Sequence, residues 1–206
     1  MQLVLATNNP DKINEIKYLL EDLPVTILTK DDFLEFPDVE ETGKTLEENA
    51  LLKAKAVAEL CELPALADDS GLEVDALDGA PGVHSSRYSG KNATYAGNCK
   101  KLLKKLKGVP NKKRTARFRC VIAIDWNDGT TDIAEGIAEG LITEDIKGKK
   151  GFGYDPVFYF PPKKKRFSEM TTEEKNVVSH RGMALQNMVG LIMKRINKLN
   201  ERRTSG

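Results

Sequence analysis

The chain has 206 residues, of which 40% are hydrophobic and 31% are charged. Its 32 Lys and Arg nearly balance its 31 Asp and Glu, which excludes an overall positive field that would draw the whole molecule to nucleic acid or to an anionic membrane. The composition also excludes a disordered chain. No linker, repeat or low-complexity segment divides residues 1–206, so we expect a single domain, whose length also allows two small lobes.

The cysteines predict the compartment. Cys61, Cys99 and Cys120 are isolated, odd in number and without a C-x-x-C spacing, which argues against a zinc site and against a disulfide framework. Such thiols suit a reducing compartment. Met1 is followed directly by a strand-like stretch instead of the basic and apolar regions of a signal peptide, and no segment approaches eighteen uninterrupted apolar residues. We therefore expect a cytoplasmic protein without a membrane partner.

The first third of the chain predicts a strand, a tight loop and two helices. Residues 2–6 are apolar like a buried strand, and after the polar loop 7–12 the apolar residues recur at helical spacing. Residues 45–62 carry a continuous apolar face, and Thr45 and Glu48 stand in the register of a capping box. This pattern is typical of an amphipathic helix that begins after Thr45.

The middle of the chain predicts short strands and a further helix. Residues 64–67 and 72–77 are expected to form two strands around a turn at Asp68 and Asp69, followed by a loop rich in Gly and Ser. Thr94–Lys107 has helical periodicity, and the glycine that follows is a good stop signal.

The second half predicts a β-hairpin, a short strand and a final helix. Residues 114–125 alternate between apolar and polar, an Asp-Gly turn follows, and residues 131–142 form the return strand. An aromatic loop precedes one more strand, and a final amphipathic helix starts at Ser179. Strands that alternate with helices, combined with a hairpin, predict an α/β fold with a mixed central sheet flanked by helices.

The loop after the first strand could bind an anion. Asn9 is a good N-cap, Pro10 suits the first helical position, and Asn8 tolerates a left-handed backbone, so free N–H groups could face the loop. Lys12 would add a full positive charge to such a site, whereas Asp11 would disfavour a phosphate unless a cation intervened. An ordinary helix cap with a solvated Lys12 explains the same residues.

Two pairs of acids could hold a divalent cation. Asp68 and Asp69 follow a buried-looking strand, and adjacent carboxylates need a proton or a positive charge close by. Glu40 and Glu41 lie in a loop before the second helix. Mg²⁺ prefers oxygen ligands and usually takes only one or two carboxylates, with water and phosphate completing its shell. The alternatives are a solvated loop and a turn with Asx hydrogen bonds.

Two stretches near the end could contact a heterocyclic base. In residues 151–156, glycines allow a close backbone approach while Phe152 and Tyr154 offer flat faces, although a core plug has the same composition. His180 and Arg181 stand side by side further on, and we expect His180 to be a neutral hydrogen-bonding group instead of a proton shuttle.

The lysines admit two interpretations. Lys53 lies at the edge of the apolar face of its helix, so its side chain either runs along apolar surface to solvent or points into a cleft. Residues 100–119 hold ten Lys or Arg and no acid, and a further basic run occupies 163–166. Because the first group is split over a helix face, a loop and a strand, we expect a solvated face and no nucleic-acid partner.

Five stretches in the order of the chain, LATNNPDK, EETGKTLEENALLKAKA, LADDSGLEVDAL with GAPGVHSSRYSG, GFGYDPVF and EEKNVVSHRGMAL, span residues 3–185. Together they resemble the inosine triphosphate pyrophosphatase family, the noncanonical purine NTP pyrophosphatases. The resemblance implies hydrolysis of ITP, dITP or XTP to the monophosphate and pyrophosphate with Mg²⁺. It also implies a homodimer of elongated α/β subunits, each with a cleft between two lobes.

The resemblance also implies roles for individual residues. Asp69 matches the proton acceptor and a metal ligand of the family. Glu40 matches the second metal ligand better than Glu41 does, although this choice depends on the alignment of a variable loop. The positions that match substrate contacts are Thr7, Asn8, Asn9, Pro10, Asp11, Lys12, Lys53, Ser70, Phe152, Gly153, Tyr154, Asp155, Lys175, His180 and Arg181. Many relatives carry Gly in place of Asn8, and both residues accept unusual backbone angles.

The resulting hypothesis places Mg²⁺ on Asp69 and Glu40 and uses Asp69, or Asp68 beside it, to accept a proton from the attacking water. Lysines would offset the phosphate charge, and hydrogen-bond donors such as Arg181 would favour a 6-keto purine over adenine. Two other classes compete: a single-stranded nucleic-acid binding module and a metal-dependent phosphomonoesterase, which would release orthophosphate.

Overall fold

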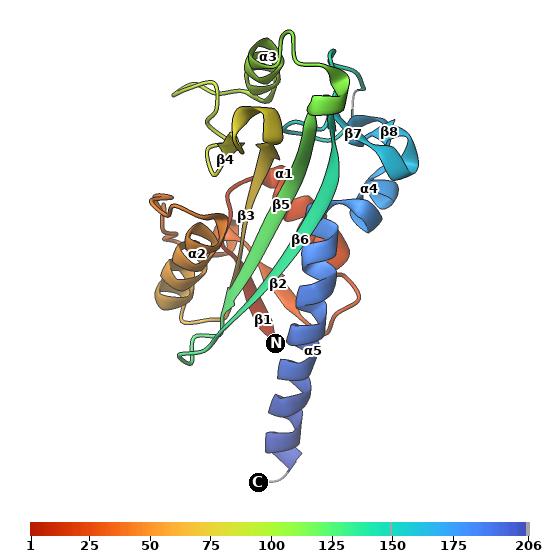
Figure 1. Cartoon of the computed structure of the whole chain (residues 1–206). Helices are drawn as coiled ribbons and strands as arrows, with labels where there is room; N and C mark the ends of the chain where they lie inside the picture. The colour runs from red at the N-terminus through yellow and green to blue at the C-terminus, as the bar shows by residue number, and fades with distance from the viewer. Residues whose placement is uncertain (149, 205–206) are drawn as a thin grey trace. The chain divides into compact units, whose positions relative to one another are not determined.

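The computed structural model describes residues 1–148 and 150–204 of the chain. The chain folds as two compact units, each assembled from separate segments (Figure 1). Unit 1 consists of Met1–Asp69, Val121–Gly136 and Met183–Gly206. Unit 2 consists of Ser70–Cys120 and Ile137–Gly182.

Eight strands form one mixed sheet with the order β2-β1-β3-β5-β6-β7-β8, and β4 pairs with β3. The strands are β1 (Gln2–Leu5), β2 (Thr26–Leu28), β3 (Ala65–Val74), β4 (Pro81–Gly82), β5 (Thr115–Asp125), β6 (Thr131–Ile142), β7 (Phe158–Phe160) and β8 (Lys165–Arg166). β1 is parallel to both β2 and β3. The pairs β3–β4, β6–β7 and β7–β8 are antiparallel. The predicted α/β class with a mixed sheet is therefore confirmed.

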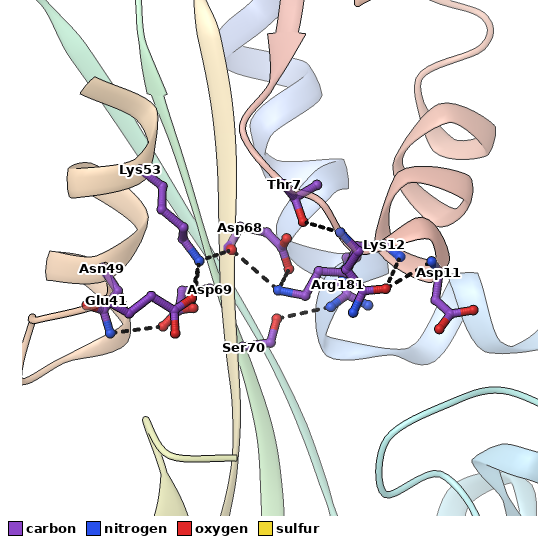
Figure 2. Close-up of polar contacts among 11 residues, drawn as sticks. Thr7, Asp11, Lys12, Glu41, Asn49, Lys53, Asp68, Asp69, Ser70 and Arg181 are labelled. Atoms are coloured by element: carbon purple, nitrogen blue, oxygen red, sulfur yellow. Dashed lines mark hydrogen bonds and ion pairs between the residues drawn. The ribbon is translucent and has the colours of Figure 1, made fainter. Parts of the chain in front are cut away.

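Unit 1 packs helices against β1 and the first half of β3. Its helices are α1 (Pro10–Leu19), α2 (Leu46–Cys61) and most of α5 (His180–Thr204). Apolar residues of the strands and helices are fully buried together, among them Leu3, Leu5, Ile16, Ala50, Ala54 and Leu66. Burial of this kind supplies the main favourable free energy of folding. It also fixes α2 on one side of β3 and α1 on the other (Figure 2).

Unit 2 is built around aromatic rings. Its helices are α3 (Tyr95–Lys105) and α4 (Thr172–Val178). Phe118 of β5 lies 4.7 Å from Phe158 of β7 between ring centroids, and Phe158 lies 4.8 Å from Phe167. Short 3₁₀ helices complete the two units: η1 (Lys30–Asp32), η2 (Asp75–Leu77), η3 (Asn111–Lys113), η4 (Pro161–Lys163) and η5 (Phe167–Glu169).

The structure confirms the predicted helices and the hairpin but corrects the predicted turn at Asp68 and Asp69. Both residues lie inside β3, which runs unbroken from Ala65 to Val74. Successive side chains of a strand point to opposite faces, so the two carboxylates are separated by the strand itself. The composition suggested a turn because acids are depleted in strands, but here each acid has its own partner, as described below.

No helix among the residues that the structure describes is both long enough and apolar enough to cross a membrane.

Candidate active site

An acid cluster in unit 1 gathers around the ammonium group of Lys53 (Figure 2). Its Nζ lies 2.8 Å from Asp69 Oδ1 and 3.0 Å from Glu41 Oε1, and it donates to the backbone oxygen of Asp68 at 2.8 Å. Lys53 comes from α2, Asp69 from β3 and Glu41 from the loop before α2. Of the two interpretations of Lys53, the structure supports the one in which the side chain points toward acidic groups.

Asp68 uses the other face of β3 and a different lysine (Figure 2). Its side chain has no exposed area, and its Oδ2 lies 3.0 Å from Lys12 Nζ. The loop before α1 is held in place because Asn9 Oδ1 accepts hydrogen bonds from the backbone N–H groups of Asp11 and Lys12. Two adjacent carboxylates are therefore compatible because two lysines from different helices neutralise them on opposite faces.

The protonation properties of the acid cluster follow from burial and from this close charge pairing. Burial raises the pKa of the Asp69 carboxyl above its ordinary range, the charge of Lys53 opposes that rise, and the charge of Glu41 adds to it. Burial lowers the pKa of Lys53, but the charges of Asp69, Asp68 and Glu41 outweigh burial, so that its pKa is raised. Lys53 therefore stays charged at neutral pH.

The structure places Glu41 in this cluster in preference to Glu40. Glu41 is half-buried and paired with Lys53, whereas Glu40 is exposed. Alternation along an extended loop explains why neighbouring acids differ in this way. Residue spacing could not separate them, because both precede α2 by a few residues.

Sequence reasoning missed Asn49, which lies on α2 one helical turn before Lys53. Its side chain is fully buried, and its Nδ2 donates to Asp69 Oδ2 at 3.4 Å. The available signal was the i, i+4 spacing, which puts Asn49 and Lys53 on the same face of the helix.

A second cluster in unit 2 surrounds the ring of Phe152. Lys175 Nζ lies 4.5 Å from the ring centroid, and the guanidinium carbon of Arg181 lies 5.4 Å from it. Lys175 also pairs with the buried carboxylate of Asp155 at 2.7 Å, and Asp155 Oδ2 accepts the Phe152 N–H at 2.9 Å. Cations over an aromatic face are attracted by its quadrupole, so these contacts fix the ring and both cations together.

Arg181 connects this cluster to β3. It is almost fully buried, and its Nη2 donates to Ser70 Oγ at 3.2 Å (Figure 2). Ser70 directly follows Asp69 along β3. The predicted contacts Ser70 and Arg181 are thus hydrogen-bonded to each other.

Two other predicted residues of unit 2 are committed to its core. The His180 ring stacks on Phe118 with centroids 4.5 Å apart and an angle of 7° between the rings. Tyr154 is buried and its hydroxyl donates to the backbone oxygen of Ser85 at 2.9 Å. Burial strongly raises the pKa of this hydroxyl, so Tyr154 stays neutral. Phe152, and not Tyr154, has the ring that the cations line.

Several basic residues of the 100–119 segment are engaged within unit 2. Arg114 is buried and donates to the backbone oxygens of Ile142, Leu106 and Thr143. Arg117 and Arg119 both form ion pairs with Glu73. These contacts support the interpretation of this segment as part of the folded surface and core of the unit.

We expect the three cysteines to differ in reactivity. Burial raises the pKa of Cys99 to about 11, and the nearby Asp155 carboxylate adds to the rise. Cys120 is fully buried, whereas Cys61 is partly exposed, although burial raises the pKa of Cys61 too. Because the thiolate is the nucleophile, iodoacetamide at pH 8 should modify Cys61 first. Peptide mass mapping over time measures this order, and equally fast labelling of Cys99 would contradict it.

Comparison with known proteins decides the family. The model of the Ham1 family matches residues 3–191. The chain belongs to the Ham1 family. The dITP/XTP pyrophosphatase of Geobacter sulfurreducens is 52% identical over 184 residues, which cover 89% of this chain and 92% of that protein. The dITP/XTP pyrophosphatase of Desulforamulus reducens is 50% identical over 192 residues, 93% of this chain and 96% of that protein.

Solved structures of Ham1 proteins have the same fold. The HAM1 protein of Coxiella burnetii superposes with a TM-score of 0.86 at 45% identity and covers 94% of this chain and 99% of its own. The Ham1 protein of Staphylococcus aureus gives a TM-score of 0.85 at 39% identity, with 95% and 100% covered. The resemblance that the five sequence stretches indicated is therefore confirmed, and the Ham1 fold with it.

Proposed function

We propose that this Ham1 family member hydrolyses the noncanonical purine triphosphates ITP, dITP and XTP to the monophosphate and pyrophosphate. Such a reaction removes deaminated purines from the nucleotide pool. The observation that carries the proposal is the buried acid cluster of Asp69 and Glu41, organised by Lys53. Relatives about half identical to this chain bear the name dITP/XTP pyrophosphatase, which supports the same substrate class.

The acid cluster suits Mg²⁺ as the cofactor. Three oxygens, from Asp69, Glu41 and the backbone of Asp68, already converge on one positive charge, the Lys53 ammonium. Among residues 1–148 and 150–204, no group of three or more His, Cys, Asp or Glu side chains could hold a metal by itself. This agrees with Mg²⁺, which is commonly bound through one or two carboxylates together with water and substrate phosphates. Asp69 and Glu41 would hold the ion, which would polarise the phosphates and offset their charge.

The protein groups have separable tasks in the proposed reaction. Asp69 accepts a proton from the water that attacks the α-phosphorus, and pyrophosphate leaves in line. A buried carboxylate suits this task because its raised pKa makes it a better base than an exposed one. Lys12 and the N–H groups at the start of α1 offset charge on the phosphate oxygens.

The Phe152 cluster suits the purine base. A flat ring offers a stacking surface, and Arg181 offers hydrogen-bond donors beside it. Hypoxanthine and xanthine carry a keto acceptor at position 6, whereas adenine carries an amino donor there. A site of donors leaves the adenine amino group without an acceptor, which disfavours ATP.

The experiment that tests the proposal is product analysis with ITP, XTP, GTP and ATP, with Mg²⁺ and with EDTA. Monophosphate, pyrophosphate and orthophosphate are followed separately. The proposal expects IMP or XMP together with pyrophosphate, little cleavage of GTP or ATP, and no activity in EDTA. Release of orthophosphate would favour a phosphomonoesterase instead. Absence of turnover together with salt-sensitive binding of single-stranded nucleic acid would favour a binding module.

Two neighbouring acids provide a matched test of the metal assignment. Glu41→Gln should raise the Mg²⁺ concentration for half-maximal activity by about tenfold or more, because it removes one of two carboxylates from the cluster. Glu40→Gln should leave it within about twofold, because Glu40 is exposed. Magnesium titrations of both variants at saturating ITP measure the difference. The reverse order would restore Glu40, which the family resemblance favoured.

We further propose a cytoplasmic homodimer. The three free thiols are compatible with a reducing compartment, and the family resemblance implies the dimer. Sedimentation equilibrium at several concentrations tests the assembly, with a monomer at all of them as the opposing result.

A further inference from the structure

We propose that Asn49, held in place by Gly43, is a positioning residue that fixes the Asp69 carboxylate and ties it to the loop carrying Glu41. The inference rests on the proposed function, in which Asp69 and Glu41 do the chemistry. It concerns residues of unit 1 alone and adds two residues, Asn49 and Gly43, to those that the family resemblance implied.

The contacts form a short relay from loop to strand. The backbone N–H of Gly43 donates to Asn49 Oδ1 at 2.8 Å. The Nδ2 of the same amide donates to Asp69 Oδ2 at 3.4 Å (Figure 2). Asn49 has no exposed area, so water cannot replace either partner without a structural change.

The relay needs an amide, because an amide has an acceptor at one end and donors at the other. The Gly43 N–H binds the oxygen end and thereby turns the nitrogen end toward Asp69. Lys53 takes the other carboxylate oxygen of Asp69, Oδ1. Both oxygens of Asp69 are thus held from successive turns of α2, and the carboxylate cannot rotate without breaking one of the two contacts.

Gly43 is required by this contact and not by its backbone conformation. A Cβ at this position would lie 2.6 Å from Asn49 Oδ1 and 2.8 Å from Glu48 Cβ, both closer than real contacts of this kind. Its φ lies outside the left-handed region, so an alanine would meet no backbone strain. Gly43→Ala therefore perturbs the same relay from its opposite end.

The consequence is a geometric link between the two acids. Glu41 lies two residues before Gly43, so the hydrogen bond to Asn49 anchors the loop that presents Glu41. Catalytic groups must be held to within a fraction of an ångström, and supporting residues supply that precision. Loss of the relay should therefore slow the chemical step more than it weakens substrate binding.

The test compares Asn49→Leu, Gly43→Ala and the double variant with two controls. Asn14→Leu is the control for the first, because Asn14 is an exposed Asn on α1. Gly190→Ala is the control for the second, because nothing lies within 4 Å of a Cβ there. We expect kcat for ITP to fall about ten- to a hundredfold in both single variants, with KM within about twofold. The controls should match the wild-type chain.

The double variant supplies the decisive comparison. If one relay is broken in both single variants, the double variant should lose no more activity than the worse single variant. Backbone amide exchange gives a readout besides activity: the Gly43 N–H should exchange faster in Asn49→Leu and stay protected in Asn14→Leu. Multiplicative losses of kcat, or unchanged Gly43 exchange, would overturn the proposal.

Failure of the proposed function can be told apart from failure of this inference. If the wild-type chain does not cleave ITP, the function proposal is wrong, whereas the amide exchange and a double-mutant cycle on the free energy of unfolding still test the relay. An additive cycle would then overturn it. If ITP is cleaved but kcat of Asn49→Leu equals that of the wild-type chain, only the positioning role is wrong.

Discussion

Asp69→Asn should lower turnover of ITP by about a thousandfold or more, because it removes both the proposed proton acceptor and a carboxylate of the metal cluster. The fold should survive. Asparagine has nearly the same shape, and Asp69 is a buried carboxylate whose raised pKa shows that its charged form gains no net stabilisation from its surroundings. The measurement is kcat for ITP at saturating Mg²⁺ together with a thermal melt.

Asp68→Asn is the matched control for this variant. Asp68 pairs with Lys12 on the opposite face of β3, so we expect its loss to reduce kcat by no more than about tenfold. This comparison also decides which of the two adjacent acids is the base. A near wild-type rate in Asp69→Asn, or a larger loss in Asp68→Asn, would contradict the assignment.

Lys53→Met should lower both activity and stability. The Lys53 ammonium contacts Asp69, Glu41 and the backbone oxygen of Asp68, and its removal leaves two carboxylates close together in a largely buried site. Breaking a buried ion pair from one side typically costs about 3 kcal/mol, and loss of a positioned charge should lower kcat about a hundredfold. Urea denaturation gives the first quantity, and steady-state kinetics with ITP gives the second.

The same helix provides the control for Lys53. Lys55 is two residues away and 67% exposed, and its pair with Glu59 at 3.8 Å spans one exposed helical turn. Exposed pairs of this kind contribute about 0.5 kcal/mol or less. Lys55→Met should therefore leave stability and kcat nearly unchanged. Equal effects of the two substitutions would show that the acid cluster does not depend on Lys53.

High magnesium offers a further check on the Lys53 variant. If the lost lysine acts by neutralising Asp69 and Glu41, a divalent cation in the same cluster should restore part of the stability that Lys53→Met loses. Melting temperatures with and without Mg²⁺ measure this. A Mg²⁺ effect no larger than that on the wild-type chain would argue that the lysine mainly packs.

Local patterns in the sequence predicted the elements of the fold well. The apolar face of residues 45–62 and the cap at Thr45 predicted α2, which runs from Leu46 to Cys61. Asn9 and Pro10 predicted the start of α1, and the alternating pattern with its Asp-Gly turn predicted the β5–β6 hairpin. These features succeed because caps, turns and periodicity depend on residues within a few positions of each other. The shortest strands, such as β2 and β8, have no such pattern and were not predicted.

Asp68 and Asp69 show where local patterns fail. A pair of acids followed by Ser and Gly has the composition of a turn, yet it lies within a continuous strand because buried strand positions on both sides hold it there. The partner of each acid lies far along the chain, Lys12 for one and Lys53 for the other. Spacing along the chain contains no information on which helix covers which face of a strand.

By itself, the sequence determined the fold class, the Ham1 family and most of the residues that carry chemistry, because motifs and periodicity are local properties. Only the tertiary structure decided how those residues are used. It placed Glu41 beside Lys53 and left Glu40 exposed, turned Tyr154 into the core, and brought the unpredicted Asn49 onto Asp69. The physical reason is that a side chain's partner depends on which elements pack together, and burial of apolar surface, not residue spacing, sets that packing.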